Sequence, residues 1–315
     1  MSWARTALFH EQLAVTLDAG LPIAEAVRLA GETAGGELRT QGKVWSAGCA
    51  GGRGLAEQLE RQAPFDRALV KAGEISGRLP EMCRELAANY RHRMALRTLV
   101  IGRLAYPVLL IHVTALAMGV VLVFMYHWPG WTIAALPLAL WLLAGSAALL
   151  LQLSGPAARA RLALRAPFSA LTMPLVAANT CIVLRAALTA GLLMPDALEL
   201  SAGACGNREL GRRLADAGRD LRHHRLDSLG AALARCGLPA LMVDHTTTGE
   251  RSGRLDQTLG QVATLMRESF RLRAEWTARV ACGAIYGGAM LAAAAAVFFF
   301  MSGYLGMIND AMKEQ

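Results

Sequence analysis

Three long stretches of this 315-residue chain contain no Asp, Glu, Lys or Arg. They cover residues 104–125, 131–153 and 280–308. Each exceeds the length of about 20 apolar residues with which a helix can cross the hydrocarbon core of a bilayer, and uncharged runs of this length are rare in soluble cores. The pattern therefore predicts three transmembrane helices, at 101–126, 131–153 and 280–308.

The polar segments beside these spans, 1–100 and 154–279, have the composition of helices. Ala, Leu, Arg and Glu dominate both segments, and runs of β-branched residues are absent. We expect about five or six short helices in each, packed as a bundle whose last helix continues into a span. The predicted fold class is an all-α membrane protein with two cytoplasmic helical bundles and three transmembrane helices.

Composition and charge refine this prediction. The chain is 54% hydrophobic and 18% charged, which excludes a disordered chain and a disulfide-dense secreted scaffold. Its net charge of +8 is concentrated near the membrane edges. The arginines that flank the spans are Arg91, Arg93, Arg97, Arg103, Arg159, Arg161, Arg165, Arg267, Arg271, Arg273 and Arg279. Such a collar favours contact with acidic lipid headgroups over contact with nucleic acid.

The same arginines predict the topology. The positive-inside rule places the N-terminus, segment 1–100 and segment 154–279 in the cytoplasm. The short loop at 127–130 and the tail at 309–315 then lie on the opposite side of the membrane. This arrangement describes a multi-pass membrane protein.

The two cytoplasmic segments share a first motif, L-x-x-x-L-x-A-G-L. Its first copy ends at Leu21 and its second copy ends at Leu192. In each copy an apolar-periodic helix meets a glycine, Gly20 or Gly191, which adopts a left-handed conformation at a helix end without penalty. A proline is expected to open the next helix, at Pro22 in the first copy and Pro195 in the second.

A second motif, G-E-x-S-G-x-L, is sharper. Six of its seven positions are identical between the copies. Its repeated residues are Gly73, Glu74, Gly77 and Leu79 in the first copy and Gly249, Glu250, Gly253 and Leu255 in the second. Each copy is followed by a long helical pattern and then by an aromatic residue early in a span, in Tyr106-Pro107 and in Tyr286-Gly287. A duplicated unit of about 100 residues explains these ordered matches.

The paired motifs, together with Tyr106-Pro107, resemble the F-domain family of type II secretion. This family contains the polytopic inner-membrane platform proteins of type II secretion and type IV pilus assembly. The resemblance covers nearly the whole chain. It implies a multi-pass protein of the bacterial inner membrane with two homologous cytoplasmic bundles, three spans and no catalytic activity. The 127–130 loop and the 309–315 tail would then be periplasmic. It also implies contact with a cytoplasmic assembly ATPase, with pilin or pseudopilin subunits and with other inner-membrane assembly proteins, and we expect a homo-oligomer.

The motifs of common enzymes are incomplete in this sequence. Gly42-Lys43 is followed by Val44 rather than by Ser or Thr, so it does not form a nucleotide-binding loop. His10-Glu11 lacks the second histidine of a zinc protease, and no G-x-S-x-G is present. We therefore predict no catalytic residues, no cofactor and no metal site. A membrane-anchored enzyme is the least favoured function class.

Glu74 and Glu250 are the strongest single candidates for a functional role. A carboxylate beside a glycine turn can accept N–H groups at the start of the following helix and stabilise its dipole. The alternative is direct contact with a partner protein. The arginine-rich stretch from Arg208 to Arg225 has two similar interpretations, a solvated helix face or a docking surface for an acidic partner or lipid.

One histidine and two faces of small residues lie within the spans. His112 lies near the middle of the first span, where an ionisable group is costly and is often functional, although a neutral histidine can also bond a neighbouring helix. Gly283 and Gly287 form a G-x-x-x-G face, and Ala115 and Gly119 form a similar small-residue face. Such faces serve either packing within one chain or dimerisation.

The function that the resemblance implies is a platform that couples a cytoplasmic ATPase to the extraction of pilin from the membrane. The alternative from another class is a small transporter or permease subunit built from a duplicated unit. The absence of charged residues in the three spans argues against transport, because a translocated polar solute usually needs a polar lining.

Overall fold

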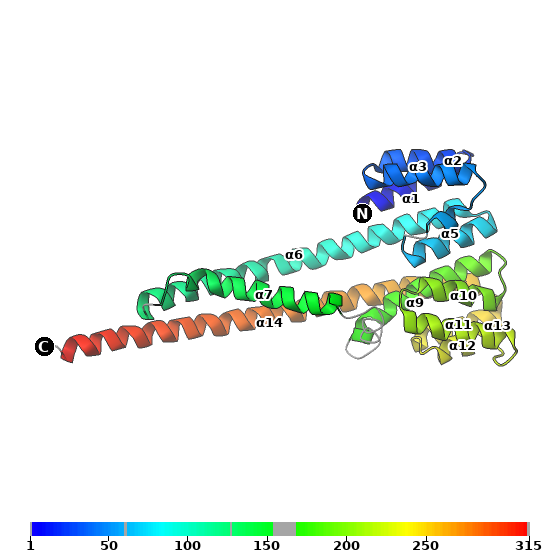
Figure 1. Ribbon diagram of the computed structural model, residues 1–315. Helices are drawn as coiled ribbons and strands as arrows, with labels where there is room; N and C mark the ends of the chain where they lie inside the picture. Colours follow the sequence, from blue (N-terminus) through cyan, green and yellow to red (C-terminus); the bar gives the residue numbers. More distant parts are fainter. Residues whose placement is uncertain (1, 60–61, 127, 154–167, 314–315) are drawn as a thin grey trace. The chain divides into compact units, whose positions relative to one another are not determined.

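The computed structural model describes residues 2–59, 62–126, 128–153 and 168–313, and every regular element in these ranges is a helix (Figure 1). The expected start of the second bundle, with Arg159, Arg161 and Arg165, lies outside the described residues, as do part of the 127–130 loop and the end of the tail.

The chain divides into two compact units. One unit joins Met1–Leu96 to Ala160–Leu272 and contains both predicted bundles. The other joins Arg97–Arg159 to Arg273–Gln315 and contains the predicted spans. The predicted fold class is confirmed by this helical architecture.

The duplication is visible in the order of the helices. The first repeat contains α1 (Trp3–Asp18), α2 (Ile23–Ala34), α3 (Glu37–Ala50), α4 (Leu55–Gln58), α5 (Pro64–Ser76) and α6 (Leu79–Tyr126). The second contains α9 (Phe168–Thr189), α10 (Met194–Ala204), α11 (Arg208–Arg222), α12 (Leu229–Arg235), α13 (Ala240–Ser252) and α14 (Leu255–Lys313). Equivalent neighbours pack in both repeats, as α1 with α2 and α9 with α10, α2 with α3 and α10 with α11, and α4 with α5 and α12 with α13.

Helical periodicity explains which faces are buried. In α2, Ala26, Val27, Ala30 and Ala34 recur on one face, and all four are buried. The equivalent face of α10 buries Ala197, Leu198, Ser201 and Ala204. Small side chains on these faces let neighbouring helices approach closely, and the buried residues of both bundles form one alanine- and leucine-rich core.

The first motif forms the same turn in both copies. Gly20 and Gly191 have φ values of +82° and +81°. The residue after each glycine donates its N–H to a carbonyl five residues earlier, as in a Schellman cap. The next helix begins three residues after each glycine. The proline stands at the start of the next helix in both copies, because Pro22 directly precedes α2 and Pro195 is the second residue of α10, where no helical N–H bond is lost.

The last helix of each bundle continues into a span, as predicted. α6 is a single helix of 48 residues and α14 one of 59, and both are drawn as unbroken ribbons in Figure 1. α6 continues through Pro107. α14 extends to Lys313, so the part of the expected tail that the structure describes is helical.

Burial identifies the spans among the apolar helices. α6, α9 and α14 are each long and apolar enough to cross a membrane, but the apolar window of α9 is 61% buried, against 11% and 6% for α6 and α14. α9 is therefore a core helix of the second bundle. α7 (Thr132–Leu153), with 22 residues and no charge, coincides with the second expected span.

Candidate functional site

The repeated G-E-x-S-G-x-L motif forms a turn between two helices. Gly77 and Gly253 both have φ of +69°, and each lies directly after a helix, α5 or α13. The N–H of Arg78 donates to the carbonyl of Gly73, and the N–H of Arg254 donates to that of Gly249, at 3.0 and 2.9 Å. Only a residue without a Cβ adopts this backbone without cost, which explains the second glycine of the motif.

The first glycine of the motif allows two helices to approach. A Cβ at Gly73 would lie 2.9 Å from Cγ of Met82 and 3.0 Å from Cα of Leu79. A Cβ at Gly249 would lie 2.0 Å from Oγ1 of Thr258. The motif therefore fixes the angle at which α5 passes into α6 and α13 into α14.

The glutamates of the motif cap short helices. Glu74 Oε1 accepts the N–H of Leu55, and both of its carboxylate oxygens lie 3.4 Å from the N of Ala56. Glu250 accepts the N–H groups of Leu229 at 3.0 Å and Gly230 at 3.2 Å. These N–H groups belong to α4 and α12, which lie before the motif in the chain, whereas the sequence suggested the helix that follows.

The two caps differ in how much support they have. α4 begins after Gly54, which has no side chain, so Glu74 supplies the only side-chain cap that the structure describes there. α12 begins after Ser228, whose hydroxyl accepts the N–H of Ala231 in addition to the two bonds of Glu250. A carboxylate at a helix N-terminus satisfies otherwise unpaired N–H groups and stabilises the dipole.

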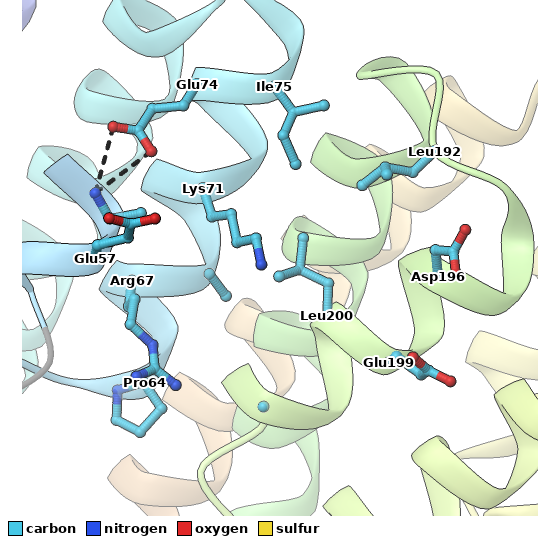
Figure 2. Close-up of a pocket in the computed structure, with 13 residues that line it drawn as sticks. Glu57, Pro64, Arg67, Lys71, Glu74, Ile75, Leu192, Asp196, Glu199 and Leu200 are labelled. Atoms are coloured by element: carbon cyan, nitrogen blue, oxygen red, sulfur yellow. Dashed lines mark hydrogen bonds between the residues drawn. The ribbon is translucent and has the colours of Figure 1, made fainter. Parts of the chain in front are cut away.

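A groove of about 750 Å³ lies beside Glu74, between α5 and α10. Figure 2 shows Arg67, Lys71 and Ile75 on the α5 side and Asp196, Glu199 and Leu200 on the α10 side. Asp196 and Glu199 pair with Arg222, at 2.6 and 3.2 Å. Charges of both signs therefore line the groove. The dashed lines in Figure 2 are the hydrogen bonds from the N–H of Ala56 to the carboxylate of Glu74.

A polar cluster that the sequence did not predict lies inside the first bundle. The hydroxyl of Tyr90, in α6, donates to Oδ2 of Asp66, in α5, and the ring of Tyr90 stacks on His10 of α1 at 6.0 Å. Asp66 is 2% exposed and His10 is 4% exposed. Burial raises the pKa of Asp66 to about 6, although the Tyr90 bond and the charge of Arg93 act in the opposite direction.

His10 and Tyr90 respond to the same burial. Burial lowers the pKa of His10 to about 4, because the charged imidazolium is poorly solvated there. Burial, together with the neighbouring Asp66, raises the pKa of Tyr90. A signal was present in the sequence, because Asp66 shares the spacing of the buried residues Leu69 and Gly73 on α5.

The candidate residues in the spans contact their own chain to different degrees. Nδ1 of His112 lies 2.6 Å from the carbonyl oxygen of Val108 in the same helix, so this polar side chain is satisfied locally. The rings of Tyr106 and Tyr286 lie 6.0 Å apart, so the two repeats meet at these aromatic residues. A sulfur contact of 3.5 Å also joins Cys282 to the carbonyl of Arg103.

The two small-residue faces also behave differently. A Cβ at Gly119 would lie 2.6 Å from Cα of Ile133, so this face is used for packing of α6 against α7. A Cβ at Gly283 or Gly287 would meet no atom within 4 Å among the described residues. The G-x-x-x-G face is therefore open within the described part of this chain.

A duplicated helical bundle, in which each copy passes without a break into the membrane, defines a polytopic helical scaffold. The family described as Type II secretion system (T2SS), protein F, matches residues 9–127 and again residues 180–305. The two matches cover most of the chain, and the chain therefore belongs to this family.

Membership confirms the resemblance and the internal repeat. The family consists of non-catalytic platform proteins of secretion and pilus systems in the inner membrane. The chain is accordingly a multi-pass inner-membrane platform protein, and membership suggests interaction with an assembly ATPase and other secretion components.

Proposed function

We propose that this chain couples a cytoplasmic ATPase to the extraction of pilin or pseudopilin subunits from the inner membrane. In this proposal the N-terminus and both bundles lie in the cytoplasm. The arginines at the bundle ends of α6 and α14 support that orientation through the positive-inside rule.

The observation that carries the proposal is the continuity of α6 and α14. Each helix begins at a G-E-x-S-G-x-L turn in a bundle and continues into a span. A continuous helix transmits rotation or displacement through its i→i−4 backbone hydrogen bonds, and α6 stays continuous although Pro107 cannot donate one of them. Work done on a bundle is then delivered to the membrane.

The contacts between the two long helices support a common movement. Tyr106 and Tyr286 lie in ring contact, and Arg103 and Glu275 form an ion pair at 3.7 Å. Farther along α14, Met290, Leu291 and Phe298 are at least 70% exposed. We propose that this apolar face receives the membrane helices of pilins. Self-association remains a further prediction.

A flexible insertion tests the coupling directly. Seven Gly and Ser residues inserted between Arg97 and Thr98 interrupt α6 between its bundle and its span. We expect pilus or pseudopilus assembly to fall at least tenfold while ATPase co-purification and membrane insertion persist. Assembly is measured in cells that lack the native gene, by shearing and quantifying surface fibres.

The matched control is a helix-forming insertion of the same length at the same place. Seven residues are close to two helical turns, so this insertion preserves continuity and nearly preserves phase. We expect it to restore much of the assembly. Equal activity with the flexible and the helical insertion contradicts rigid coupling, and failure of the wild-type chain to bind the ATPase contradicts the proposed function itself.

A further inference from the structure

The corner between α11 and α12 contains a charged pocket of about 380 Å³. Its lining is Asp216, Arg219, Asp220, His223, Arg225 and Arg235. These residues come from the end of α11, the following loop and the end of α12. The pocket belongs to the second bundle alone and is separate from the groove beside Glu74.

A buried carboxylate organises the arginines of this pocket. Asp220 is 8% exposed, and its two oxygens lie 3.4 Å from Nη1 of Arg225 and 2.7 Å from Nη1 of Arg235. The side chains of these arginines are themselves 72% and 61% exposed. Asp220 therefore fixes one edge of each guanidinium, and the remaining N–H donors stay available to an anion from outside.

The first repeat forms the equivalent corner without this cluster. Aligning Leu38 of α3 with Leu210 of α11 brings the buried positions of the two helices into register. This alignment pairs Asp220 with Gly48. Gln58 occupies the space above Gly48, where a Cβ would lie 1.9 Å from its Oε1. Because the same helix pair forms with Gly48, the fold does not require the Asp220 cluster.

The charge pattern indicates an extended acidic ligand. Residues 208–235 contain seven arginines and four acidic residues, whereas residues 37–61 contain four basic and three acidic residues. Arg208, Arg212 and Arg219 lie within about 40° of one another around α11, because successive residues turn by about 100°. This stripe leads into the pocket, so it offers several carboxylate contacts in a row, whereas a single small anion would occupy only the pocket.

We propose that the Asp220-organised pocket and the α11 stripe bind an acidic segment of the cytoplasmic ATPase partner, an inference that rests on the proposed function. Carboxylates of that segment pair with Arg225 and Arg235 inside the pocket. At its rim they pair with the N–H donors of Arg219 that its ion pair with Asp216 leaves free. The first repeat lacks an equivalent surface among its described residues, so the two bundles differ in what they bind.

The test uses the full chain in nanodiscs of zwitterionic lipid and the fluorescently labelled assembly ATPase. We expect Arg225→Gln with Arg235→Gln to raise the Kd about tenfold, as expected for the loss of two partly exposed ion pairs. The matched control is Arg39→Gln with Lys43→Gln, which removes two exposed charges from α3 and should change the Kd less than twofold. Hexaglutamate peptide should compete with the ATPase for the wild-type chain.

For Asp220→Asn, the proposed pocket predicts weaker binding, whereas a simple charge effect predicts stronger binding. This substitution makes the chain more positive, so a diffuse electrostatic attraction would strengthen binding. Organisation by Asp220 predicts weaker binding, because the arginines lose the carboxylate that positions them. Arg225 and Arg235 are exposed, so their substitution keeps the test valid even if the Asn variant unfolds.

Other results of these binding measurements would overturn the proposed function or the proposed pocket. A wild-type chain that does not bind the ATPase overturns the proposed function, and this inference with it. An unchanged Kd for the Arg225 and Arg235 pair, or an equal loss for the control pair, overturns the pocket but leaves the platform function standing. Tighter binding by Asp220→Asn also overturns it, as does binding that appears only with anionic lipid in the nanodiscs.

Discussion

The two bundles share a backbone plan but differ in the chemistry of their interiors. When the two motifs are aligned, three buried polar residues of the first bundle correspond to apolar or weakly polar residues of the second. The pairs are His10 and Cys181, Asp66 and Met242, and Tyr90 and Met266. The turns of the motifs are nearly identical in the two copies. The duplication therefore retained the residues that set the backbone, whereas side chains that only fill the core changed freely.

The polar cluster has opposing effects on stability as the pH changes. The pKa of Asp66 is raised from 3.8 to about 6 in the fold. The stability that Asp66 contributes is therefore fully present below pH 3.8 and is lost as pH rises through about 6. The pKa of His10 is lowered from 6.5 to about 4, so its contribution is present above pH 6.5 and is lost as pH falls through about 4. Between pH 4 and 6, the changes of unfolding free energy with pH that Asp66 and His10 cause have opposite signs and nearly cancel.

Substituting either residue should leave the pH dependence that the other causes in the opening free energy of the first bundle. This is the largest effect that we predict. In Asp66→Asn, the opening free energy of the first bundle should fall by about 3 kcal/mol as pH falls from 6.5 to 4. In His10→Gln, it should instead rise by about 3 kcal/mol as pH falls from 6 to 4. Hydrogen exchange of α5 and α6 amides in the full chain, corrected for intrinsic rates, measures both changes.

The second bundle is the internal control for this measurement. Met242 and Met266 do not titrate, so the pH profile of α13 exchange should be the same in the wild type and in both variants. Parallel profiles for Asp66→Asn and His10→Gln contradict the assignment of opposite slopes to these two residues.

Substituting the glycines that precede the repeated glutamates should lower the stability of each bundle by a somewhat smaller amount. Gly73→Ala and Gly249→Ala should each destabilise their bundle by about 1–3 kcal/mol through overpacking. The atoms that the added methyl group would contact differ between the two sites. The three nearest atoms at Gly249 all belong to the side chain of Thr258, whereas one of those at Gly73 is the backbone Cα of Leu79.

A second substitution distinguishes the two glycine sites. Thr258→Ala should recover part of the loss in Gly249→Ala, whereas Met82→Ala should recover less in Gly73→Ala, because the Leu79 backbone stays in place. Labelling rates of Cys83 and Cys181, which are fully buried in the first and second bundle, report the opening of each bundle separately. Equal recovery at both sites contradicts the role given to the Leu79 backbone.

The features that the sequence predicted correctly depend on short stretches of chain. Uncharged runs predicted long apolar helices, which the structure forms as α6, α7 and α14. A glycine after an apolar helix predicted the left-handed turns at Gly20 and Gly191, because φ is a local property of the residue. The Gly-rich motif predicted the duplication, and the helical pattern after it predicted the continuity of α6 and α14.

The features that the sequence did not predict depend on tertiary packing. The N–H partners of Glu74 lie 18 and 19 residues earlier in the chain, so motif spacing pointed to the wrong helix. The cluster of His10, Asp66 and Tyr90 assembles from three helices, and no short window of sequence contains all three. α9 differs from α6 and α14, which are also long and apolar enough to cross a membrane, in its burial, which depends on the other helices of the bundle.

The repeated glutamates give the smallest predicted effect. Glu74→Ala should destabilise α4 by about 1–2 kcal/mol, because no other described side chain caps that helix. Glu250→Ala should cost about 0.5–1 kcal/mol at α12, because Ser228 still caps Ala231. Hydrogen exchange of the first-turn amides of each helix measures both values.

The asymmetry between the caps also distinguishes the two roles that the sequence left open. If capping is the whole role, Ser228→Ala combined with Glu250→Ala should reproduce the loss seen in Glu74→Ala, and ATPase binding should follow the local stability in every variant. A role in partner contact predicts a different order, because binding would then fall in Glu74→Ala or Glu250→Ala while the protection of Leu55 and Leu229 amides stayed unchanged. Both carboxylates already accept two backbone N–H groups, which use about half of the four lone-pair sites of each carboxylate and favour the first outcome.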